Sequence, residues 1–350
     1  MTDYTLSVSL AGTPLSKEVM DNIVSVDVLE SLDELTAISV TFTVPRTAEM
    51  ASLLTQFLPG QALSLSIARG TAAPATFHGD LIDVRHRQGG GRAWTATLRA
   101  LDRLHLLGKR PRTRVWEGSP SIIVETIGRE HGLQVVAEAV TATTDYTFQA
   151  NVPDAVFLKR LAAMNNYYLH LEGQTLRFGR RNLPYNATTL MTFGEEVVSL
   201  DVNLSLRDQV TQVTALGWDY VTNQPVVGLA TSTQLRNISG GETGVARAVM
   251  VFGEVKLVLD NLPFRTQSEA TAAATAALQA RAERYVTGRV VGRGDPLALC
   301  GGLMTLSDSG AFDGDYLIRQ IHHEVRQSGG FQTTLEFFSD SMPATTSVAR

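Results

Sequence analysis

FDGDYLIRQIHHEVRQSGGFQTTLEFF, residues 312–338, is the stretch that decides the fold. Two apolar runs flank the turn RQSGG, a pattern that predicts a long antiparallel hairpin. A similar series occurs near the N-terminus, as FHGDL (77–81), RQGGG (87–91) and WTATL (94–98). Both copies read F-x-G-D-apolar, strand, R-Q-x-G-G turn, aromatic residue and T-L strand. The residues interpreted as counterparts are Phe77, Gly79 and Asp80 in one copy and Phe312, Gly314 and Asp315 in the other.

A second, weaker correspondence supports the first. VSVDV (24–28) resembles VSLDV (198–202), and each begins a long strand pair. The two repeated pieces occur in the same order, which indicates a duplication. We therefore expect two related antiparallel, tube-like β-barrels, one at each end of the chain, with a different segment between them.

Composition and charge exclude several classes of protein. The chain is 44% hydrophobic and 19% charged, as in folded proteins, and its 350 residues exceed one ordinary core. A net charge of −5 argues against a dedicated nucleic-acid surface, and no apolar run reaches the roughly 18 residues that span a bilayer. The single Cys300 excludes an intrachain disulfide and predicts a reducing compartment. The N-terminal MTDYTLSVSLAG predicts a first strand rather than a signal peptide.

The pattern along the chain predicts a mainly β protein with some helix. Alternation in residues 38–44, 63–67, 77–84 and 94–100 predicts the strands of a closed or nearly closed barrel. Helices are predicted over 119–131 and 153–165, and a strand pair over 167–179. A helix over 266–284 begins with a capping box of Thr266 and Glu269. Its alanine stripe predicts packing against a flat surface, with an exposed polar interaction surface as the alternative.

These signals divide the chain into three segments. We expect a first barrel in residues 1–110, a mixed α/β middle segment in 111–189, and a second barrel in 190–350. The second barrel would carry the alanine-rich helix and a frayed C-terminus. Exchange of strands between the barrels would make these boundaries discontinuous.

The reactive side chains in the opening stretch do not predict chemistry. His322 and His323 are adjacent in a predicted strand, so they point to opposite faces and cannot easily hold one ion. Asp308, Asp313 and Asp315 do not match a calcium loop. Cys300 has no orienting partner at a recognisable spacing. We therefore expect no catalytic, cofactor-binding or metal residues.

Two further groups of charges have competing interpretations. The carboxylate pairs Glu195–Glu196 and Asp33–Glu34 would suit a cell-wall hydrolase, but their positions at strand entries favour surface turns. The basic run 109–114 predicts either a solvated linker or an electrostatic contact with an acidic partner.

Three blocks resemble the phage late control gene D family, the baseplate hub of contractile tails, which includes the hub portion of the type VI secretion protein VgrG. The blocks are SPSIIVETIGREHGL (119–133), YTFQANVPDAVFLKRLAAMNNYYLHLEGQTLRFG (146–179) and the series from the alanine-rich helix through GDPLALCGG to residue 338. They appear in the family's order. The signature residues carried over are structural: Gly132, Phe157, Leu158, Arg160, Leu161, Gly179, Pro296, Gly301, Phe312, Gly314, Tyr316, Gly329, Gly330 and Thr333.

The resemblance implies a non-enzymatic structural role. It implies a homotrimer whose pseudo-six-fold face docks on a hexameric tail tube and whose other face receives a trimeric spike, expected here as a separate polypeptide. Baseplate wedge and tape-measure proteins are further possible partners. It implies a virion or injection-particle tail baseplate, assembled in the bacterial host cytoplasm. The alternatives are the hub of a non-contractile tail or gene-transfer particle and, in another class, a tail-associated cell-wall hydrolase.

Overall fold

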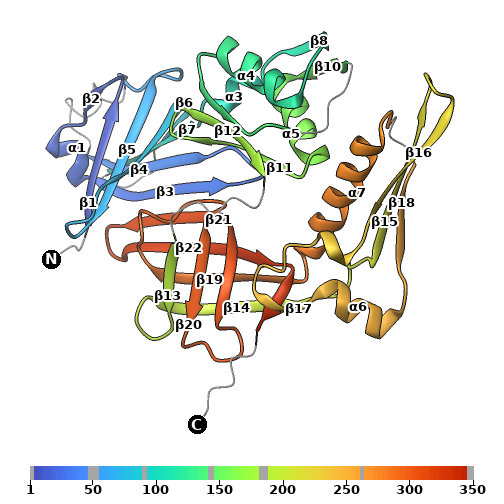
Figure 1. The fold of residues 1–350 in the computed structure, drawn as a ribbon. Coiled ribbons are helices and arrows are strands. Elements are labelled where there is room, and N and C mark those ends of the chain that lie inside the picture. The colour runs from blue at the N-terminus through green and yellow to red at the C-terminus, as the bar shows by residue number, and fades with distance from the viewer. Residues whose placement is uncertain are drawn as a thin grey trace.

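A strongly curled sheet of thirteen strands is the largest sheet in the described part of the protein (Figure 1). The computed structural model describes residues 4–45, 55–88, 93–140, 146–180, 188–260 and 264–344. The first barrel follows the strand path β3–β4–β7–β6–β5–β1. Its elements are β1 (Tyr4–Leu10), β2 (Thr13–Pro14), α1 (Lys17–Asp21), β3 (Ile23–Ser31), β4 (Ala37–Pro45), β5 (Ala62–Arg69), β6 (Ala75–Arg87) and β7 (Ala93–Leu101). The alternation predicted from the sequence is therefore confirmed for β4 to β7.

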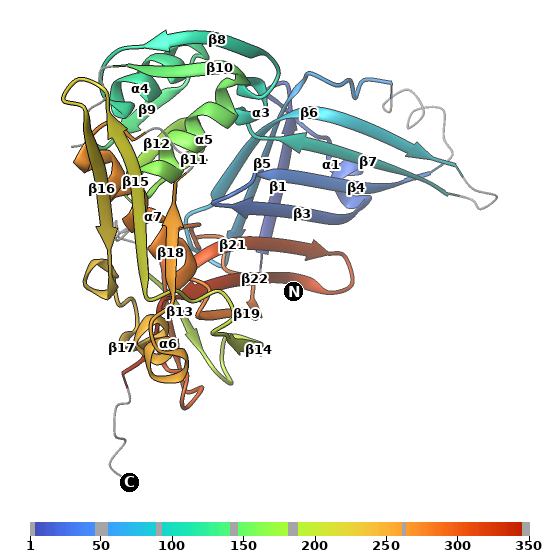
Figure 2. The ribbon, with the colours of Figure 1, turned by 90° about the vertical axis from the view of Figure 1, so that its right-hand side faces the viewer.

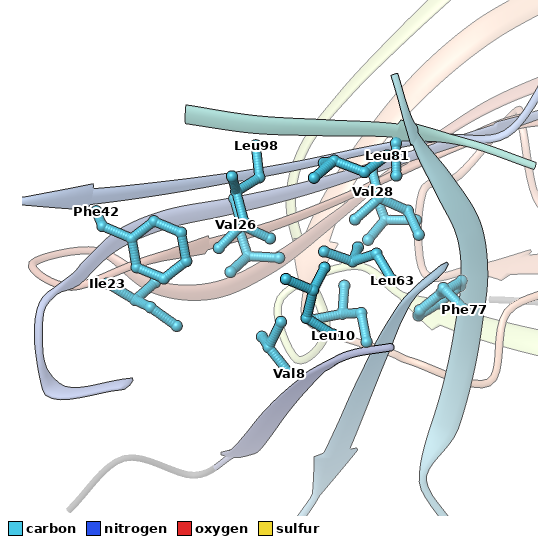
Figure 3. Packing of buried hydrophobic residues seen from close by; sticks show 14 of the residues in the cluster. Val8, Leu10, Ile23, Val26, Val28, Phe42, Leu63, Phe77, Leu81 and Leu98 are labelled. Atoms are coloured by element: carbon cyan, nitrogen blue, oxygen red, sulfur yellow. The ribbon is translucent and has the colours of Figure 1, made fainter. Parts of the chain in front are cut away.

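The inward positions of these strands make one apolar core. Figure 3 shows Val26 and Val28 of β3 pointing toward Phe42 of β4, Leu63 of β5 and Leu98 of β7. Each of them is at most 2% exposed, whereas the intervening positions are more accessible. Burial of alternate side chains fixes which face of each strand looks inward.

The second barrel repeats the path of the first, strand for strand. Its order is β14–β19–β22–β21–β20–β13. The strands are β13 (Thr188–Thr192), β14 (Val197–Leu204), β19 (Val286–Arg293), β20 (Leu303–Ser307), β21 (Gly314–Arg326) and β22 (Gly330–Ser339). One difference is that β13 runs parallel to β20, whereas β1 runs antiparallel to β5. The two related barrels expected from the sequence are thus confirmed.

The bulges of the two barrels also coincide. The ladder of β3 with β4 shifts between Ile23 and Ser25, and that of β14 with β19 shifts between Val197 and Ser199. This alignment of residue 24 with residue 198 is the one that the weaker sequence correspondence predicts. The bulge is therefore a feature that the two barrels share rather than a local defect.

The F-x-G-D motifs, by contrast, are not in the same register. The second pair of bulges falls after Leu81, opposite Ala100, and after Ile318, opposite Phe337. When these two bulges are aligned, Asp80 of the first barrel corresponds to Leu317 of the second. Leu317 lies two residues after Asp315, the counterpart that the motif suggests. Both aspartates lie in strands rather than turns, because Asp80 is inside β6 and Asp315 is the second residue of β21.

Strand β21 joins the barrels into one sheet. Seven residue pairs connect it to β3, from Gln320 opposite Ser31 to Arg326 opposite Ser25. The tip of the β21–β22 hairpin then enters the first barrel, where Val325 is buried in the core and Phe331 packs against it. The Phe331 ring also meets Tyr4 edge-on, with 6.1 Å between ring centroids. One hairpin therefore belongs to both barrels.

The middle segment is mixed α and β, as the sequence predicts, and lies beside the first barrel (Figure 1). Its elements are α3 (Leu104–Leu107), β8 (Pro111–Trp116), α4 (Pro120–Glu130), β9 (Gln134–Ala137), β10 (Thr147–Pro153), α5 (Asp154–Met164), β11 (Tyr167–Glu172) and β12 (Thr175–Arg180). Residues 109–114 are not a linker, because most of them form β8, which pairs with β10. Ser119 and Pro120 begin α4 as predicted.

An inserted unit separates β14 from β19 in the second barrel. Its elements are β15 (Gln212–Asp219), β16 (Gln224–Ala230), a 3₁₀ turn η1 (Ser232–Gln234), β17 (Gly240–Thr243), α6 (Gly244–Phe252), β18 (Lys256–Leu259) and α7 (Gln267–Ala282); β17 pairs with β23 (Ser341–Pro343). Strands β16, β15 and β18 form a separate sheet. The equivalent connection in the first barrel, from β3 to β4, is a short turn.

Helix α7 packs flat on one face of this sheet, as its alanine stripe predicts (Figure 2). The Thr266–Glu269 capping box is present. Close approach is possible because β16 has a glycine at the contact: a Cβ on Gly228 would lie 2.1 Å from the backbone of Ala270. The end of β22 anchors the unit, since the buried Asp340 carboxylate accepts backbone N–H bonds from Asn237 and Ile238.

Candidate functional site

A cluster of charged side chains lies where β3 meets β21. His322, Glu324 and Arg326 occupy alternate positions of β21 and share one face with Asp27 of β3. His322 Nε2 is 3.2 Å from Asp27 Oδ1. Arg326 donates to both oxygens of Asp27 at 3.0 Å and, through Nε, to Glu324 at 2.6 Å. Burial raises the pKa of Asp27, but hydrogen bonds from His322 and Arg326 outweigh it and leave this pKa below its usual value.

This cluster has metal-ligand spacing but already holds a cation. Asp27, His322 and Glu324 bring ligand atoms within 4.8 Å of one another, the only such group in the described parts of the chain. The His322–Glu324 pair, two apart on a strand, is a pairing that the sequence analysis missed. Arg326 binds both the Asp27 and the Glu324 carboxylates. The cluster is therefore a salt-bridge network that links β3 of the first barrel to β21 of the second.

His323 points the opposite way, as its adjacency to His322 predicts, and is completely buried. Its ring packs between Phe77 and Phe331, and Nδ1 lies 3.0 Å from Thr333 Oγ1. Burial, followed by the charge of His322, lowers the pKa of His323 to about 3. A neutral, immobilised imidazole of this kind supports packing between the barrels.

A cavity of about 550 Å³ lies beside this seam. Its lining includes Glu30 and Asp102 of the first barrel, Glu172 at the end of β11, and the loop 296–299 of the second barrel. Burial, then the charges of Glu172 and Asp102, raise the pKa of Glu30 to about 7. Burial also raises the pKa of Asp102, against hydrogen bonds from the Thr36 and Leu104 amides. These carboxylates are spread around the cavity and do not converge on one point.

The signature residues of the middle segment occupy structural positions. Phe157, Leu158 and Leu161 are buried on α5, whereas Arg160 of the same helix is exposed. Gly132 follows α4 with φ +70°, a conformation that few residues other than glycine adopt. Gly179 pairs with Tyr168 between β12 and β11. Apart from the exposed Arg160, these residues belong to the core, the strand pair and the helix end.

The signature residues of the second barrel shape its loops. Tyr316 is fully buried, and its hydroxyl donates to the Phe312 carbonyl at 2.7 Å. Gly301 donates to the Ile318 carbonyl at 2.8 Å, and Gly329 and Gly330 form the β21–β22 turn. Thr333 accepts from the Asp295 amide at 2.8 Å, which fixes the loop that contains Pro296. A Cβ on Gly314 would lie 2.9 Å from the Pro343 side chain.

Other candidate groups are engaged in structure. Cys300 is buried, and burial raises the pKa of its thiol, which disfavours the nucleophilic thiolate. Arg112 and Arg114 of the basic run bind Glu130, and Arg114 Nη2 donates to the buried Asp154 at 2.6 Å. The turn glycines 89–91 of the first repeat lie outside the described residues. Among the described residues, no helix is long and apolar enough to cross a membrane.

Comparison with known structures identifies the fold. A 43 kDa tail protein of prophage MuSo2 from Shewanella oneidensis has a TM-score of 0.72 and 13% identity, covering 95% of this chain and 98% of that one. A tail protein from Neisseria meningitidis MC58 also has a TM-score of 0.72 and 13% identity, covering 96% and 97%. The E. coli c3393 protein, a component of the type VI secretion system, has a TM-score of 0.61 and 13% identity, covering 97% and 77%. The chain therefore has the fold of these proteins.

The sequence comparison names a family other than the one expected. No curated protein matches the sequence. The family model that matches is described as the Alg8 N-terminal domain, over residues 2–327, and not as late control gene D. The resemblance is thus confirmed for the tail-protein fold but not for the late control gene D family itself. By the extent of this match, the chain belongs to the Alg8 N-terminal domain family.

Proposed function

We propose that this chain is the structural, non-enzymatic hub of a phage or phage-like tail baseplate. The observation that carries the proposal is the shared strand order of the two barrels. A trimer of such chains presents six similar barrels, so one of its faces can match a hexameric tail tube. The fold shared with two tail proteins and a type VI secretion component supports this role.

The opposite face would have three-fold character. The inserted unit occurs only in the second barrel, so a trimer carries three copies of it. Such a face suits a trimeric spike protein, and wedge and tape-measure proteins would contact the periphery. The particle would assemble in the bacterial host cytoplasm and place this chain in the tail baseplate. The three late control gene D-like blocks favour a contractile tail over a non-contractile tail or a gene-transfer particle.

The charged groups favour a structural role over a hydrolase. The carboxylates at the seam are bound by Arg326. Glu195 and Glu196 lie in the turn between β13 and β14, where Glu196 accepts from the Thr192 amide at 3.2 Å. Incubation of the purified chain with peptidoglycan tests the alternative, and release of soluble fragments would contradict the proposal.

Mass measurement of the chain mixed with its spike or tube protein tests the hub directly. We expect a complex that contains three copies of this chain. A chain that never associates with either partner would overturn the proposed function. A monomer in isolation would not, because an obligate contact can require the partner.

A further inference from the structure

The inserted unit has an apolar face that α7 does not cover. In β15 and β16 one set of alternate residues is buried under α7, while the other set is exposed. Leu216 pairs directly with Val227, and Thr214 lies between Leu229 and Val258. The exposed apolar side chains therefore form a continuous strip: Leu216, Trp218, Val227, Leu229 and Val258 are each 40–50% exposed.

Helix α6 carries a second group of exposed apolar side chains. Its last four residues, Val249 to Phe252, are all apolar and all at least 50% exposed, with Met250 at 72%. A helix that packs only on its own protein buries one stripe and exposes polar residues elsewhere. Residues 253–255 join the end of α6 directly to β18, an edge strand of the inserted sheet. We call the exposed strip, α6 residues 249–252 and the hairpin-tip residues Tyr220 and Val221 the inserted face.

The size and chemistry of the inserted face fit a permanent contact. Its eleven side chains together expose on the order of 1,000 Å², compared with the roughly 800 Å² that each partner buries in a stable interface. Lys256, the charged residue on the outer side of β18, is paired with Glu254 at 2.9 Å. Interfaces between identical subunits are the class with an apolar core poor in charges. A second copy of the chain is therefore the best-matched occupant.

A ring requires a different, complementary surface on the same chain, because a cyclic trimer is built from heterologous contacts. A groove of about 390 Å³ between the barrels offers such a surface. Its lining is mixed: Leu190 of β13 and Leu297 are 67% and 47% exposed, and the charged residues Arg69, Glu196, Arg293 and Asp295 also line it. Figure 1 places β13 and the inserted sheet on different sides of the second barrel.

We propose that the inserted face of one copy packs against the β13 groove of the next copy, and that three such contacts close the ring. The proposal rests on the hub function and adds the residues through which the copies meet. The same insertion that breaks the equivalence of the two barrels then makes the trimer.

Sedimentation velocity of the full chain with matched glutamate variants tests this contact. Leu229→Glu and Met250→Glu alter the inserted face, Leu190→Glu alters the groove, and Val136→Glu is a control at a similarly exposed strand position in the middle segment. We expect the wild type and the control to form trimers. Each face or groove variant should be monomeric, with an association constant at least about 100-fold weaker. Unchanged circular dichroism and thermal midpoints would show that the variants fold.

Mixing variants tests the heterologous geometry. Leu229→Glu retains an intact groove and Leu190→Glu retains an intact face, so the mixture should form a dimer although neither chain associates alone. Trimers that persist in both variants would overturn the contact while leaving the hub function standing. A groove variant that still associates, or a wild type that stays monomeric and uses the inserted face to bind the spike, would also overturn it. Failure to bind either spike or tube would instead overturn the proposed function.

Discussion

Val24 and Val198 are the extra residues of two β-bulges that occupy equivalent positions in the two barrels. Each stands at the start of the long strand that opens its barrel, and each is exposed. Because a bulge reverses the facing of the residues before it, Val24 allows Ile23 to point into the core together with Val26.

Deletion of Val24 should therefore lower the unfolding free energy far more than truncation of its side chain to alanine. Without the extra residue, the Ile23 side chain leaves the core, with an expected loss of about 2 kcal/mol of unfolding free energy. Val24→Ala should change it by about 0.5 kcal/mol or less, since the side chain is exposed. Urea unfolding of the two variants measures the difference. Equal effects would show that the bulge does not set the register.

Gly228 should tolerate no side chain. A Cβ there would lie 2.1 Å from the α7 backbone at Ala270, so α7 would have to move away from the sheet. We expect Gly228→Ala to lower the unfolding free energy by at least about 3 kcal/mol. Gly108→Ala is the control, since a Cβ there would lie 3.4 Å from the His105 carbonyl oxygen, an ordinary van der Waals contact. Thermal unfolding that shifts equally in both variants would contradict the close packing of α7.

Acid should destabilise the protein through His323. Burial lowers its pKa from 6.5 to about 3, so between these values the unfolded chain binds a proton that the folded chain does not. The unfolding free energy therefore falls as the pH drops through this window, by up to about 1.4 kcal/mol per pH unit. Denaturant unfolding at several pH values should show a shallower acid loss for His323→Gln than for the wild type.

Glu30 provides a comparison of opposite sign. Its pKa is raised from 4.5 to about 7, so the folded chain binds the extra proton and the associated stability is lost as the pH rises through this window. The difference in stability between Glu30→Gln and the wild type should therefore increase from pH 4.5 to pH 7. If the unfolding free energy of His323→Gln or of Glu30→Gln depends on pH in the same way as that of the wild type, the burial of the corresponding group is contradicted.

Removal of the Arg326 side chain should convert the salt-bridge network between β3 and β21 into a metal site. Arg326→Ala would leave Asp27, His322 and Glu324 with ligand atoms within 4.8 Å and no neutralising cation. We expect this variant to bind Zn²⁺ at least about tenfold more tightly than the wild type, in isothermal titration calorimetry. Adding His322→Ala should abolish the gain. Equally tight binding by the wild type would show that Arg326 does not occupy the site.

The sequence predicts the elements of the fold better than their partners. Alternation identified β4 to β7, and the capping box at Thr266 located α7, because both signals are local. The pairing of β3 with β21 joins residues some 300 positions apart, and periodicity does not specify which strands pair. The F-x-G-D motifs look equivalent in the sequence, but alignment of the bulges after Leu81 and Ile318 shows that the motifs differ by two residues in register.

Helix α6 and the seam cluster were missed for different physical reasons. The run of residues 249–252 is apolar on every side and has no helical stripe, although Thr243 as N-cap and Gly253 after the last turn were readable signals. The seam cluster needs Asp27 from a distant strand, so the spacing of His322 and Glu324 alone did not reveal it. The inserted sheet lies within the residues that the sequence assigned to the second barrel, yet pairs only within itself.

Electron microscopy of the chain assembled with its spike or tube protein tests the central claim most directly. The account predicts a ring of three subunits around a channel, with six similar barrel densities on one face and three inserted units per ring. A ring with any other number of subunits, or one whose two barrels per chain are not arranged with pseudo-six-fold symmetry, would contradict it.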